Sequence, residues 1–330
     1  MSPEEYKQAV EKLRAEKTLP QIEEDFKAFK SKYFVKWMQE KNTENCTGDY
    51  LVNCKNCIEC FDSENLENSK YCSDLKKADK VSFGNCDISY FGLGVDHSYE
   101  CSVAGYGVNH TLFCENVWES YDVMYSQLCV NGSHDLFGCI GLKKGEYAIL
   151  NKKYNKEEYG KLVPRIIEHM RGTGQFGEFF PVSMSGFGYN ETNAQEYFPL
   201  RKEKVLRRGF HWRDLKDPNY SGVTKKLKAS IIPNDIKEIP DEILNWAIEC
   251  DISGRLFQIQ KSELAFYRKM NLSIPRLHPD ERHKRRFESR NPRHLERRSC
   301  TNCGRDMPTT ISQERSNRVY CEKCYLNSVY

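Results

Sequence analysis

The residue types and spacing best suited to chemistry lie near the C-terminus, where two Cys-x-x-Cys pairs are separated by seventeen residues. Cys300 and Cys303 form the first pair, and Cys321 and Cys324 form the second. Each pair offers two thiolates from one tight turn, and four thiolates make the tetrahedral donor set that zinc prefers. Four protein ligands leave no open coordination position, so we expect one Zn²⁺ ion with a structural role.

An incomplete arrangement of the same form precedes these cysteines. Cys250 stands three residues before Ser253, and His278 stands three residues before Glu281. Serine is a poor zinc ligand, and glutamate is only an occasional one. We therefore interpret the segment as a zinc-ribbon-like module that has lost its metal, with a Cys250/His278/Glu281 metal site as the alternative. A second zinc ion is not expected.

The same stretch holds a group that could imitate a metal-dependent nuclease, formed by His278, Asp280, Glu281 and His283. Polar turn residues in a module without metal are the more ordinary interpretation. The sequence contains no phosphate-binding loop, dinucleotide-binding fingerprint, His-Glu-x-x-His motif or nucleophile elbow. We assign no catalytic residue and favour a protein that is not an enzyme, with a metal nuclease as a remote alternative.

A basic run extends from Arg276 to Arg298, with nine arginines and lysines against four acidic residues. Arginine outnumbers lysine, which suits bidentate contacts with phosphate. The run therefore predicts binding to the backbone of RNA or DNA. Docking onto an acidic partner, including the chain's own acidic region, and simple solvation are the alternatives. The predicted nucleic-acid contacts are Arg282, Lys284, Arg285, Arg286, Arg290, Arg293, Arg297 and Arg298.

The acidic region is visible only when charge is counted by segment, because the whole chain has a net charge of +3. Residues 42–142 hold five basic and fifteen acidic residues, whereas residues 143–330 hold 36 basic and 24 acidic ones. Such asymmetry predicts two surfaces that have different partners or face one another. An alternative function is therefore that of a structural protein that forms homo-oligomers through its acidic and basic surfaces.

Ten of the fifteen cysteines lie within residues 46–150, in short apolar segments separated by Asn, Asp, Ser and Gly. Apolar anchors recur there at intervals of 13, 11, 13 and 12 residues. This spacing predicts the short strands of a β-solenoid-like repeat domain, with a meander sheet as the alternative. Cysteine would be a small apolar residue stacked inside the solenoid, although Cys54, Cys57 and Cys60 could instead bind a metal. The anchors are Tyr99, Leu112, Val123, Leu136 and Ala148.

Helical patterns flank the repeats. Before them, residues 2–41 predict two helices, the second with an apolar stripe from Ile22 to Trp37 that packs on the protein itself. After them, residues 155–171 predict a helix that caps the repeats, with Asn155 and Glu158 as its capping box.

The N-terminus lacks the apolar segment of a secretion signal, and no stretch approaches the ~18 consecutive apolar residues of a membrane span. An odd number of cysteines without an export signal favours thiols and metal sites over disulfides. We therefore expect a cytoplasmic protein with no membrane partner.

Several phrases together indicate a relationship. The chain resembles a family of uncharacterised Cys-rich repeat proteins with C-terminal zinc ribbons, found mainly in candidate-phyla bacteria. Members often carry Cys-x-x-Cys at both incomplete positions described above, so this chain departs from the family there. The resemblance covers residues 30–330 and implies architecture but no activity. The phrases are Asn53-Cys54-Lys55-Asn56-Cys57, Leu136–Lys152, Gly188-Tyr189-Asn190-Glu191-Thr192, Glu263–Arg268 and Tyr320–Tyr325.

Together these patterns predict a multidomain α+β protein with tandem C-terminal zinc-ribbon modules, the first one degenerate. Its expected function is that of a zinc-stabilised, non-enzymatic binding protein, whose basic C-terminal half contacts nucleic acid or a nucleoprotein through phosphates. The expected parts are an N-terminal helical segment (1–42), an acidic Cys-rich β repeat domain (43–154), a capping helix (155–172), an irregular aromatic and basic strap (173–245), a degenerate zinc-ribbon-like module (246–290) and a zinc ribbon (291–330).

Overall fold

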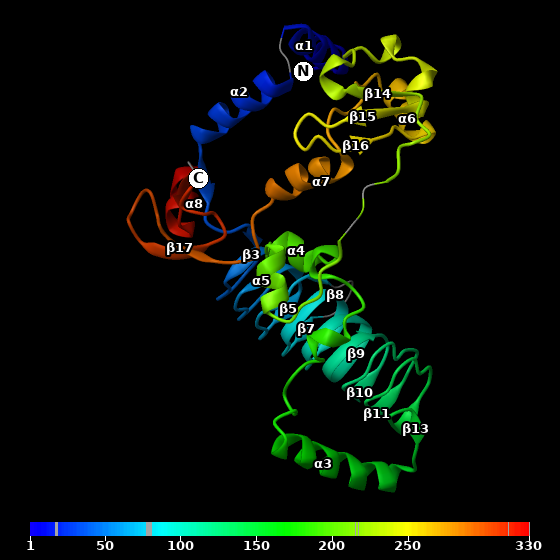
Figure 1. The fold of residues 1–330 in the computed structure, drawn as a ribbon. Helices are drawn as coiled ribbons and strands as arrows, with labels where there is room; N and C mark the ends of the chain where they lie inside the picture. The colour runs from blue at the N-terminus through cyan, green and yellow to red at the C-terminus, as the bar shows by residue number, and fades with distance from the viewer. Residues whose placement is uncertain (17–18, 77–80, 215, 217, 316, 330) are drawn as a thin grey trace. The chain divides into compact units, whose positions relative to one another are not determined.

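The computed structural model describes residues 1–16, 19–76, 81–214, 216, 218–315 and 317–329. The chain forms two compact units (Figure 1). The first unit comprises Met1–Pro181 together with Pro292–Tyr330, and the second comprises Val182–Asn291. None of the helices in the described segments combines the length and hydrophobicity that a bilayer crossing requires.

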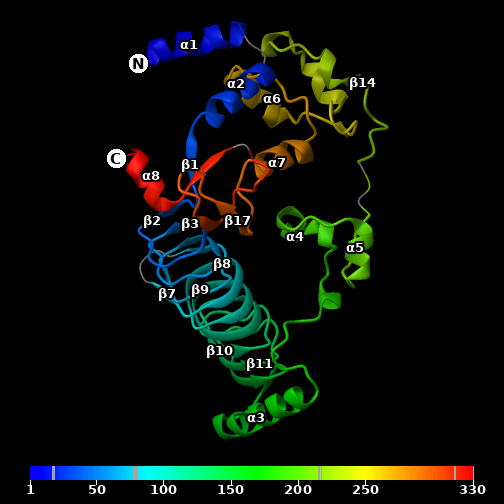
Figure 2. The ribbon, with the colours of Figure 1, turned by 90° about the vertical axis from the view of Figure 1, so that its left-hand side faces the viewer.

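A β-solenoid forms the body of the first unit, and Figures 1 and 2 show its turns stacked along one axis. Its strands pair in parallel with those of the next turn. Gly48 pairs with Cys60 and Cys86 with Tyr99, twelve and thirteen residues apart, whereas Leu66 pairs with Ser82, sixteen residues apart. This confirms the predicted solenoid and excludes the meander sheet. The strands are β2 (Glu40–Lys41), β3 (Gly48–Val52), β4 (Cys60–Glu64), β5 (Leu66–Glu67), β6 (Leu75–Lys76), β7 (Ser82–Phe83), β8 (Cys86–Asp96), β9 (Tyr99–Val117), β10 (Tyr121–Met124), β11 (His134–Phe137) and β12 (Glu146–Ile149).

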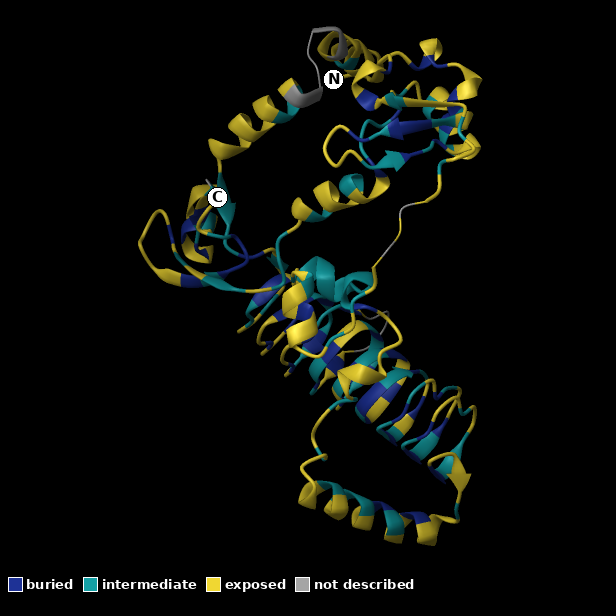
Figure 3. Cartoon of the chain, viewed as in Figure 1, coloured by how far each residue is buried: buried dark blue, intermediate teal, exposed yellow. Residues whose placement is uncertain are grey.

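The solenoid repeats in triplets, and Figure 3 shows buried and exposed residues alternating along its turns. Between residues 51 and 66 every third side chain points inward and is buried. The residue before each inward position has a positive φ, as at Asn53 (52°) and Asp62 (50°). Asn and Asp adopt this left-handed conformation more readily than other non-glycine residues. Their frequency therefore follows from the number of corners that each turn contains.

Stacked asparagines strengthen these corners. The Asn53 side-chain amide donates to Asn65 Oδ1 over 3.0 Å, and the Asn56 amide donates to Asn68 Oδ1 over the same distance. Each bond joins one turn to the next, as in other stacked parallel strands. The Asn-x-x-Asn part of the phrase Asn53–Cys57 is thus a corner signal.

The inward cysteines also satisfy the backbone at these corners. The Cys57 thiol donates to the carbonyl oxygen of Lys55 over 3.4 Å, and the Ser63 hydroxyl does the same to Phe61 over 2.8 Å. A thiol at this position is therefore a small apolar group that still donates a hydrogen bond. Burial accordingly raises the pKa of Cys129 and Cys139, which suits a packing role.

The register differs from the predicted one at two anchors. The inward residues that align with Val123, Leu136 and Ala148 are Ser98 and Thr111, not their neighbours Tyr99 and Leu112. Ser98 and Thr111 are buried and their hydroxyls hydrogen-bond each other over 2.8 Å. Hydrophobicity pointed to the wrong residues because a paired set of hydroxyls fills the interior at these turns.

The last turn is closed by β13 (Lys152–Lys153), which runs antiparallel to β12, and by helix α3 (Lys156–Gly172). The predicted capping box of Asn155 and Glu158 is present. Tyr159 and Val163 of α3 pack against Phe137 and Ile149 of the solenoid. The helix therefore covers this end of the solenoid, as predicted.

The predicted strap at 173–245 is divided between the two units. Its first residues lie along the solenoid, where Phe176 contacts the rings of Phe113 and Tyr125. From residue 182 onward the chain belongs to the second unit. Other apolar residues of the predicted strap, including Ile232, Ile236 and Ile243, belong to the core of that unit.

The N-terminal segment also differs from the prediction. Helices α1 (Pro3–Glu16) and α2 (Leu19–Ser31) are present, but α2 ends before Tyr33 and Trp37. Strand β1 (Phe34–Lys36) follows and pairs in parallel with β19 (Arg318–Tyr320) near the C-terminus. A pairing across the whole sequence thus overrides the helical spacing. Phe26 and Phe29 are 58% and 52% exposed, so the expected packing of the stripe is wrong there.

Residues 292–329, which we call the four-cysteine module, complete the first unit. They form the antiparallel hairpin of β17 (Glu296–Ser299) and β18 (Asp306–Thr309), strand β19 and helix α8 (Glu322–Val329).

The second unit contains a three-stranded sheet and four helices among its described residues. In the sheet, β15 (Trp246–Glu249) lies between parallel β14 (Lys225–Lys228) and antiparallel β16 (Leu256–Phe257). Its 3₁₀ turns span 182–184, 189–191, 229–231, 236–238 and 241–245. The helices are α4 (Asn193–Tyr197), α5 (Lys202–Arg207), α6 (Lys261–Lys269) and α7 (Pro279–Glu288).

Candidate metal centre and nucleic-acid interface

The first Cys-x-x-Cys pair occupies the turn between β17 and β18. The backbone NH of Cys300 donates to the carbonyl of Arg305 over 2.8 Å, and the NH of Gly304 donates back to the carbonyl of Cys300 over 2.9 Å. Gly304 has a φ of +73°, a conformation that glycine adopts without the steric cost of a Cβ. The sequence therefore folds here into a tight knuckle that presents both thiols on one side.

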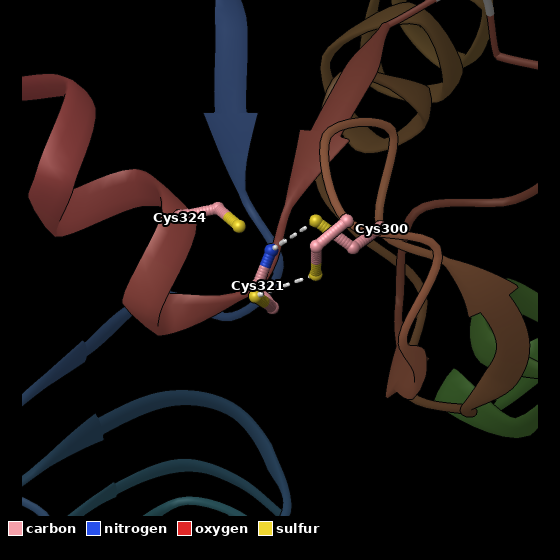
Figure 4. Close-up of side chains that lie close together, drawn as sticks. Cys300, Cys321 and Cys324 are labelled. Carbon is pink, nitrogen blue, oxygen red and sulfur yellow. Dashed lines mark hydrogen bonds between the residues drawn. The ribbon is translucent and has the colours of Figure 1, made fainter.

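The second pair begins where β19 ends and helix α8 starts. The NH of Thr301 donates to the carbonyl of Val319 over 2.9 Å and ties the knuckle to β19. The NH of Cys321 then donates to Cys300 Sγ over 3.3 Å. In Figure 4 the side chains of Cys300, Cys321 and Cys324 turn toward a common space.

The sulfur positions fit a metal ion. The Sγ atoms of Cys300, Cys303, Cys321 and Cys324 all lie within 4.8 Å of one another. Cys303 Sγ and Cys321 Sγ are 3.8 Å apart. Two sulfurs on a tetrahedral zinc with bonds of about 2.3 Å would be separated by about 3.8 Å. Among the described residues, no other group of three or more His, Cys, Asp or Glu side chains is this close.

Electrostatics also favour a cation at this place. Burial opposes ionisation of Cys300, but hydrogen bonds from the backbone of Cys321, Cys303 and Asn302 outweigh it and lower the pKa to about 6. The Asn302 amide favours the thiolate of Cys324, yet burial and the neighbouring thiols raise its pKa to about 11. Four adjacent thiolates cannot all carry charge unless a cation offsets their repulsion.

The four-cysteine module has little hydrophobic core of its own. Its buried apolar residues besides cysteines are Met307, Ile311 and Val319, and Val35 and Trp37 from the start of the solenoid pack against them. So few apolar side chains provide little burial energy for a segment of this length. A bound metal would supply the missing free energy of folding.

The incomplete arrangement around Cys250 has the same backbone fold. The NH of Cys250 donates to the carbonyl of Arg255 over 2.9 Å, and the NH of Gly254 donates to the carbonyl of Cys250 over 3.0 Å. The NH of Asp251 donates to the carbonyl of Arg276, two residues before His278, over 3.3 Å. These bonds match those of the four-cysteine module position by position. We call residues 225–288 the counterpart module.

The thiol environment is retained as well. Burial again opposes ionisation of Cys250, and hydrogen bonds from Ser253 and from the backbone of His278 lower its pKa. Gly254 has a φ of +68°, close to that of Gly304. The structure therefore places Cys250, Ser253, His278 and Glu281 where the four cysteines stand in the four-cysteine module.

The side chains at these positions serve other purposes. His278 is 8% exposed, and its Nδ1 accepts a hydrogen bond from the NH of Asp280 over 3.1 Å, which caps helix α7. Within the described part of the chain, Cys250, His278 and Glu281 do not form a compact metal-ligand group. Their arrangement fits a module whose ligands have been replaced.

The proposed nuclease residues are also engaged elsewhere. Asp280 forms an ion pair with Arg255 over 2.7 Å, and His283 Nε2 lies 2.6 Å from Glu196 Oε1. The structure does not bring these two side chains and His278 together as a compact group in the described residues.

Three of the predicted nucleic-acid contacts have structural roles instead. Arg282 is paired with Glu263 over 3.3 Å, and Arg298 donates to the carbonyl of Ser312 over 2.7 Å. Arg293 is 10% exposed and pairs with Asp62 and Asp74 of two solenoid turns, each over 2.7 Å. These three side chains are only partly exposed and are held by internal carboxylates and carbonyls, so they are less available to phosphate than the exposed residues of the set.

The other five residues of the set are exposed: Lys284, Arg285, Arg286, Arg290 and Arg297. Lys284, Arg285 and Arg286 are consecutive on helix α7, and Arg290 follows its end. Phe287 fixes the helix in the second unit by packing its ring edge-on against Tyr197, with 5.0 Å between centroids. The basic side chains thus project from an anchored helix.

Sequence reasoning missed Asp49 and Thr310, which hold the four-cysteine module to the solenoid. Asp49 is 1% exposed, and the hydroxyl of Thr310 donates to its carboxylate. No local pattern marks either residue. Asp49 stands beside an inward position of the triplet and not on it, and its partner lies near the other end of the sequence.

Comparison with known proteins adds no family or function. No protein-family model matches the chain, and no curated protein and no solved structure is significantly similar to it. The resemblance to Cys-rich repeat proteins stays a prediction.

Proposed function

We propose that this protein is a zinc-stabilised, non-enzymatic binding protein that contacts the phosphates of nucleic acid through the exposed basic surface of helix α7. We define this basic surface as Lys284, Arg285, Arg286 and Arg290. Zinc is the proposed metal because four thiolates at tetrahedral spacing are its preferred structural site. A closed four-sulfur site supports a structural role for the ion.

The observation that carries the nucleic-acid proposal is the distribution of charge along α7. The acidic residues Asp280 and Glu281 lie in its first turn, where they suit the helix dipole. Toward the other end, the consecutive residues Lys284, Arg285 and Arg286 are exposed, and Glu288 is the one acidic residue in the last turn of the helix. Guanidinium groups in such a row suit phosphate oxygens, and the contacts need no particular base sequence.

The experiment is a titration of labelled single- and double-stranded RNA and DNA with the full chain, measured by fluorescence anisotropy across a salt series. We expect log K to fall linearly with log salt, with a slope of about 0.9 per phosphate contact on duplex DNA and about 0.7 on single strands. The double variant Arg285→Ala/Arg286→Ala should lower the slope by roughly one to two, because each arginine removed takes one phosphate contact with it.

The matched control is Lys261→Ala/Lys269→Ala, which removes two exposed positive charges from helix α6 of the same unit. We expect it to leave affinity nearly unchanged. Affinity that ignores salt, or equal losses in both double variants, would contradict contact through α7.

A further inference from the structure

We propose that the four-cysteine module is a metal-dependent cap on the first turn of the solenoid, so that loss of the metal uncovers this end. The proposal rests on the proposed metal binding but not on nucleic-acid binding. Solenoids need a terminal cap because their end turns expose unpaired backbone and apolar side chains. Helix α3 and β13 serve at the far end.

The cap begins with strand pairing between the two ends of the sequence. Strand β1 pairs with β19, with Phe34 opposite Arg318 and Lys36 opposite Tyr320. The pairing continues as the NH of Trp37 donates to the carbonyl of Tyr320 over 3.0 Å. The next residue after Tyr320 is a cysteine of the second pair, so the strand that covers β1 leads straight into a metal ligand.

Hairpin strand β18 adds a second layer of contacts. The hydroxyl of Thr309 donates to the carbonyl of Trp37 over 2.6 Å. Next to it, the hydroxyl of Thr310 donates to the buried carboxylate of Asp49 in β3. The other oxygen of this carboxylate accepts from the backbone NH groups of Gln39 and Tyr50 over 2.7 and 3.0 Å. Loss of the Thr310 hydroxyl would leave a buried carboxylate oxygen without this donor, which is costly.

Arg293 fastens the module to the side of the solenoid. Its guanidinium bridges Asp62 and Asp74, which occupy the same corner of successive turns. Its contacts therefore reach beyond the first turn. Metal holds this assembly only indirectly, because it joins the knuckle after β17 to the segment after β19. Without metal, the small core of the four-cysteine module would not keep β18 and β19 in place.

Loss of the cap would expose the start of the solenoid. Val35 and Trp37 would lose their partners in the four-cysteine module, and the backbone of β1 would lose its hydrogen bonds to β19. Backbone amides near this end should therefore exchange faster with solvent once the metal is removed.

The test is hydrogen–deuterium exchange on the full chain, with the metal-loaded protein compared with Cys321→Ser/Cys324→Ser. We expect amides in residues 34–64 to exchange about tenfold faster or more in the variant. Amides in residues 134–149, at the far end of the solenoid, serve as the internal control and should not change.

A second variant separates the cap from the metal. Thr310→Val removes the hydroxyl that reaches Asp49 but leaves all four thiols, so it should keep its metal and loosen residues 34–64 to a smaller extent. Unchanged exchange in both variants would overturn the cap. A parent protein that binds no metal would instead contradict the proposed function.

Discussion

The four-cysteine module and the counterpart module share one backbone design but differ in what stabilises it. In both, a knuckle closes with the same pair of hydrogen bonds, a left-handed glycine follows the second ligand position, and a helix begins directly after the third. One module places four thiols in the ligand positions. The other places Cys250, Ser253, His278 and Glu281 there.

The two modules also differ in the size of their hydrophobic cores: the counterpart module, which lacks the four thiols, has the larger core. The core cluster of the counterpart module contains eleven buried residues, most of them aliphatic, and several come from the segment that precedes its knuckle. Each buried Ile or Leu side chain contributes about 1.5–3 kcal/mol, so this core can replace the stabilisation of a metal. The comparison indicates that the knuckle fold needs a further source of stability. The counterpart module has an aliphatic core, and a bound metal is the proposed source in the four-cysteine module.

Installing thiols in the counterpart module should have the largest effect on this difference. The variant Ser253→Cys/His278→Cys/Glu281→Cys should bind a second metal ion, because the backbone already matches that of the four-cysteine module. We expect two ions per chain by elemental analysis and a raised midpoint of unfolding for residues 225–288, since metal binding adds to folding free energy. Cobalt substitution should show a thiolate-to-metal absorption band that doubles relative to the parent chain.

The variant Ser253→Cys/His278→Asn is the matched control, since two thiols and one carboxylate do not complete a tetrahedral set. A triple variant that folds and still holds one ion would show that the two knuckles differ in geometry.

A truncation in the aliphatic core should have the next largest effect. Ile248 is fully buried in β15, so Ile248→Ala should destabilise the second unit by about 2–5 kcal/mol through a lost side chain and a cavity. Ile252→Ala, in the knuckle itself, changes a side chain that is 65% exposed and should cost less than about 0.5 kcal/mol. Denaturant unfolding monitors both, and metal content should stay constant. Equal effects of the two variants would argue against a core that replaces metal.

The smallest effect is expected at His278, which occupies the position in the counterpart module that Cys321 occupies in the four-cysteine module. His278 caps helix α7 through its Nδ1, so His278→Ala should cost about 0.5–2 kcal/mol. His278→Asn keeps a side-chain acceptor and should recover most of that loss. Thermal unfolding of the two variants is the measurement. Equal losses of stability in His278→Ala and His278→Asn would show that His278 does not act by capping the helix.

Local patterns predicted the parts of this molecule that local physics dictates. The spacing of the four cysteines and the Asn155–Glu158 capping box each depend on neighbours in sequence. The solenoid was predictable because its triplets repeat, but Ser98 and Thr111 escaped notice because their interior hydrogen bond makes polar residues acceptable inside.

The remaining features depend on partners far away in the sequence. The pairing of β1 with β19 joins residues near opposite ends of the chain, and no local pattern in either strand identifies the other as its partner. Arg293 lies in a basic run and resembles the other arginines there, yet it forms ion pairs with Asp62 and Asp74. Likewise, the aliphatic residues before β15 belong to a core that becomes visible only when the sheet forms.

Metal content of the full chain and two paired variants tests the central claim most directly. Purified without added metal and measured by native mass spectrometry with elemental analysis, the parent should hold one zinc ion. Cys321→Ser/Cys324→Ser should hold none, and Cys250→Ser/His278→Asn should hold one, because the proposed ion belongs to the four-cysteine module. A parent without metal, or a zinc ion that follows Cys250 and His278 instead of Cys321 and Cys324, would contradict this account.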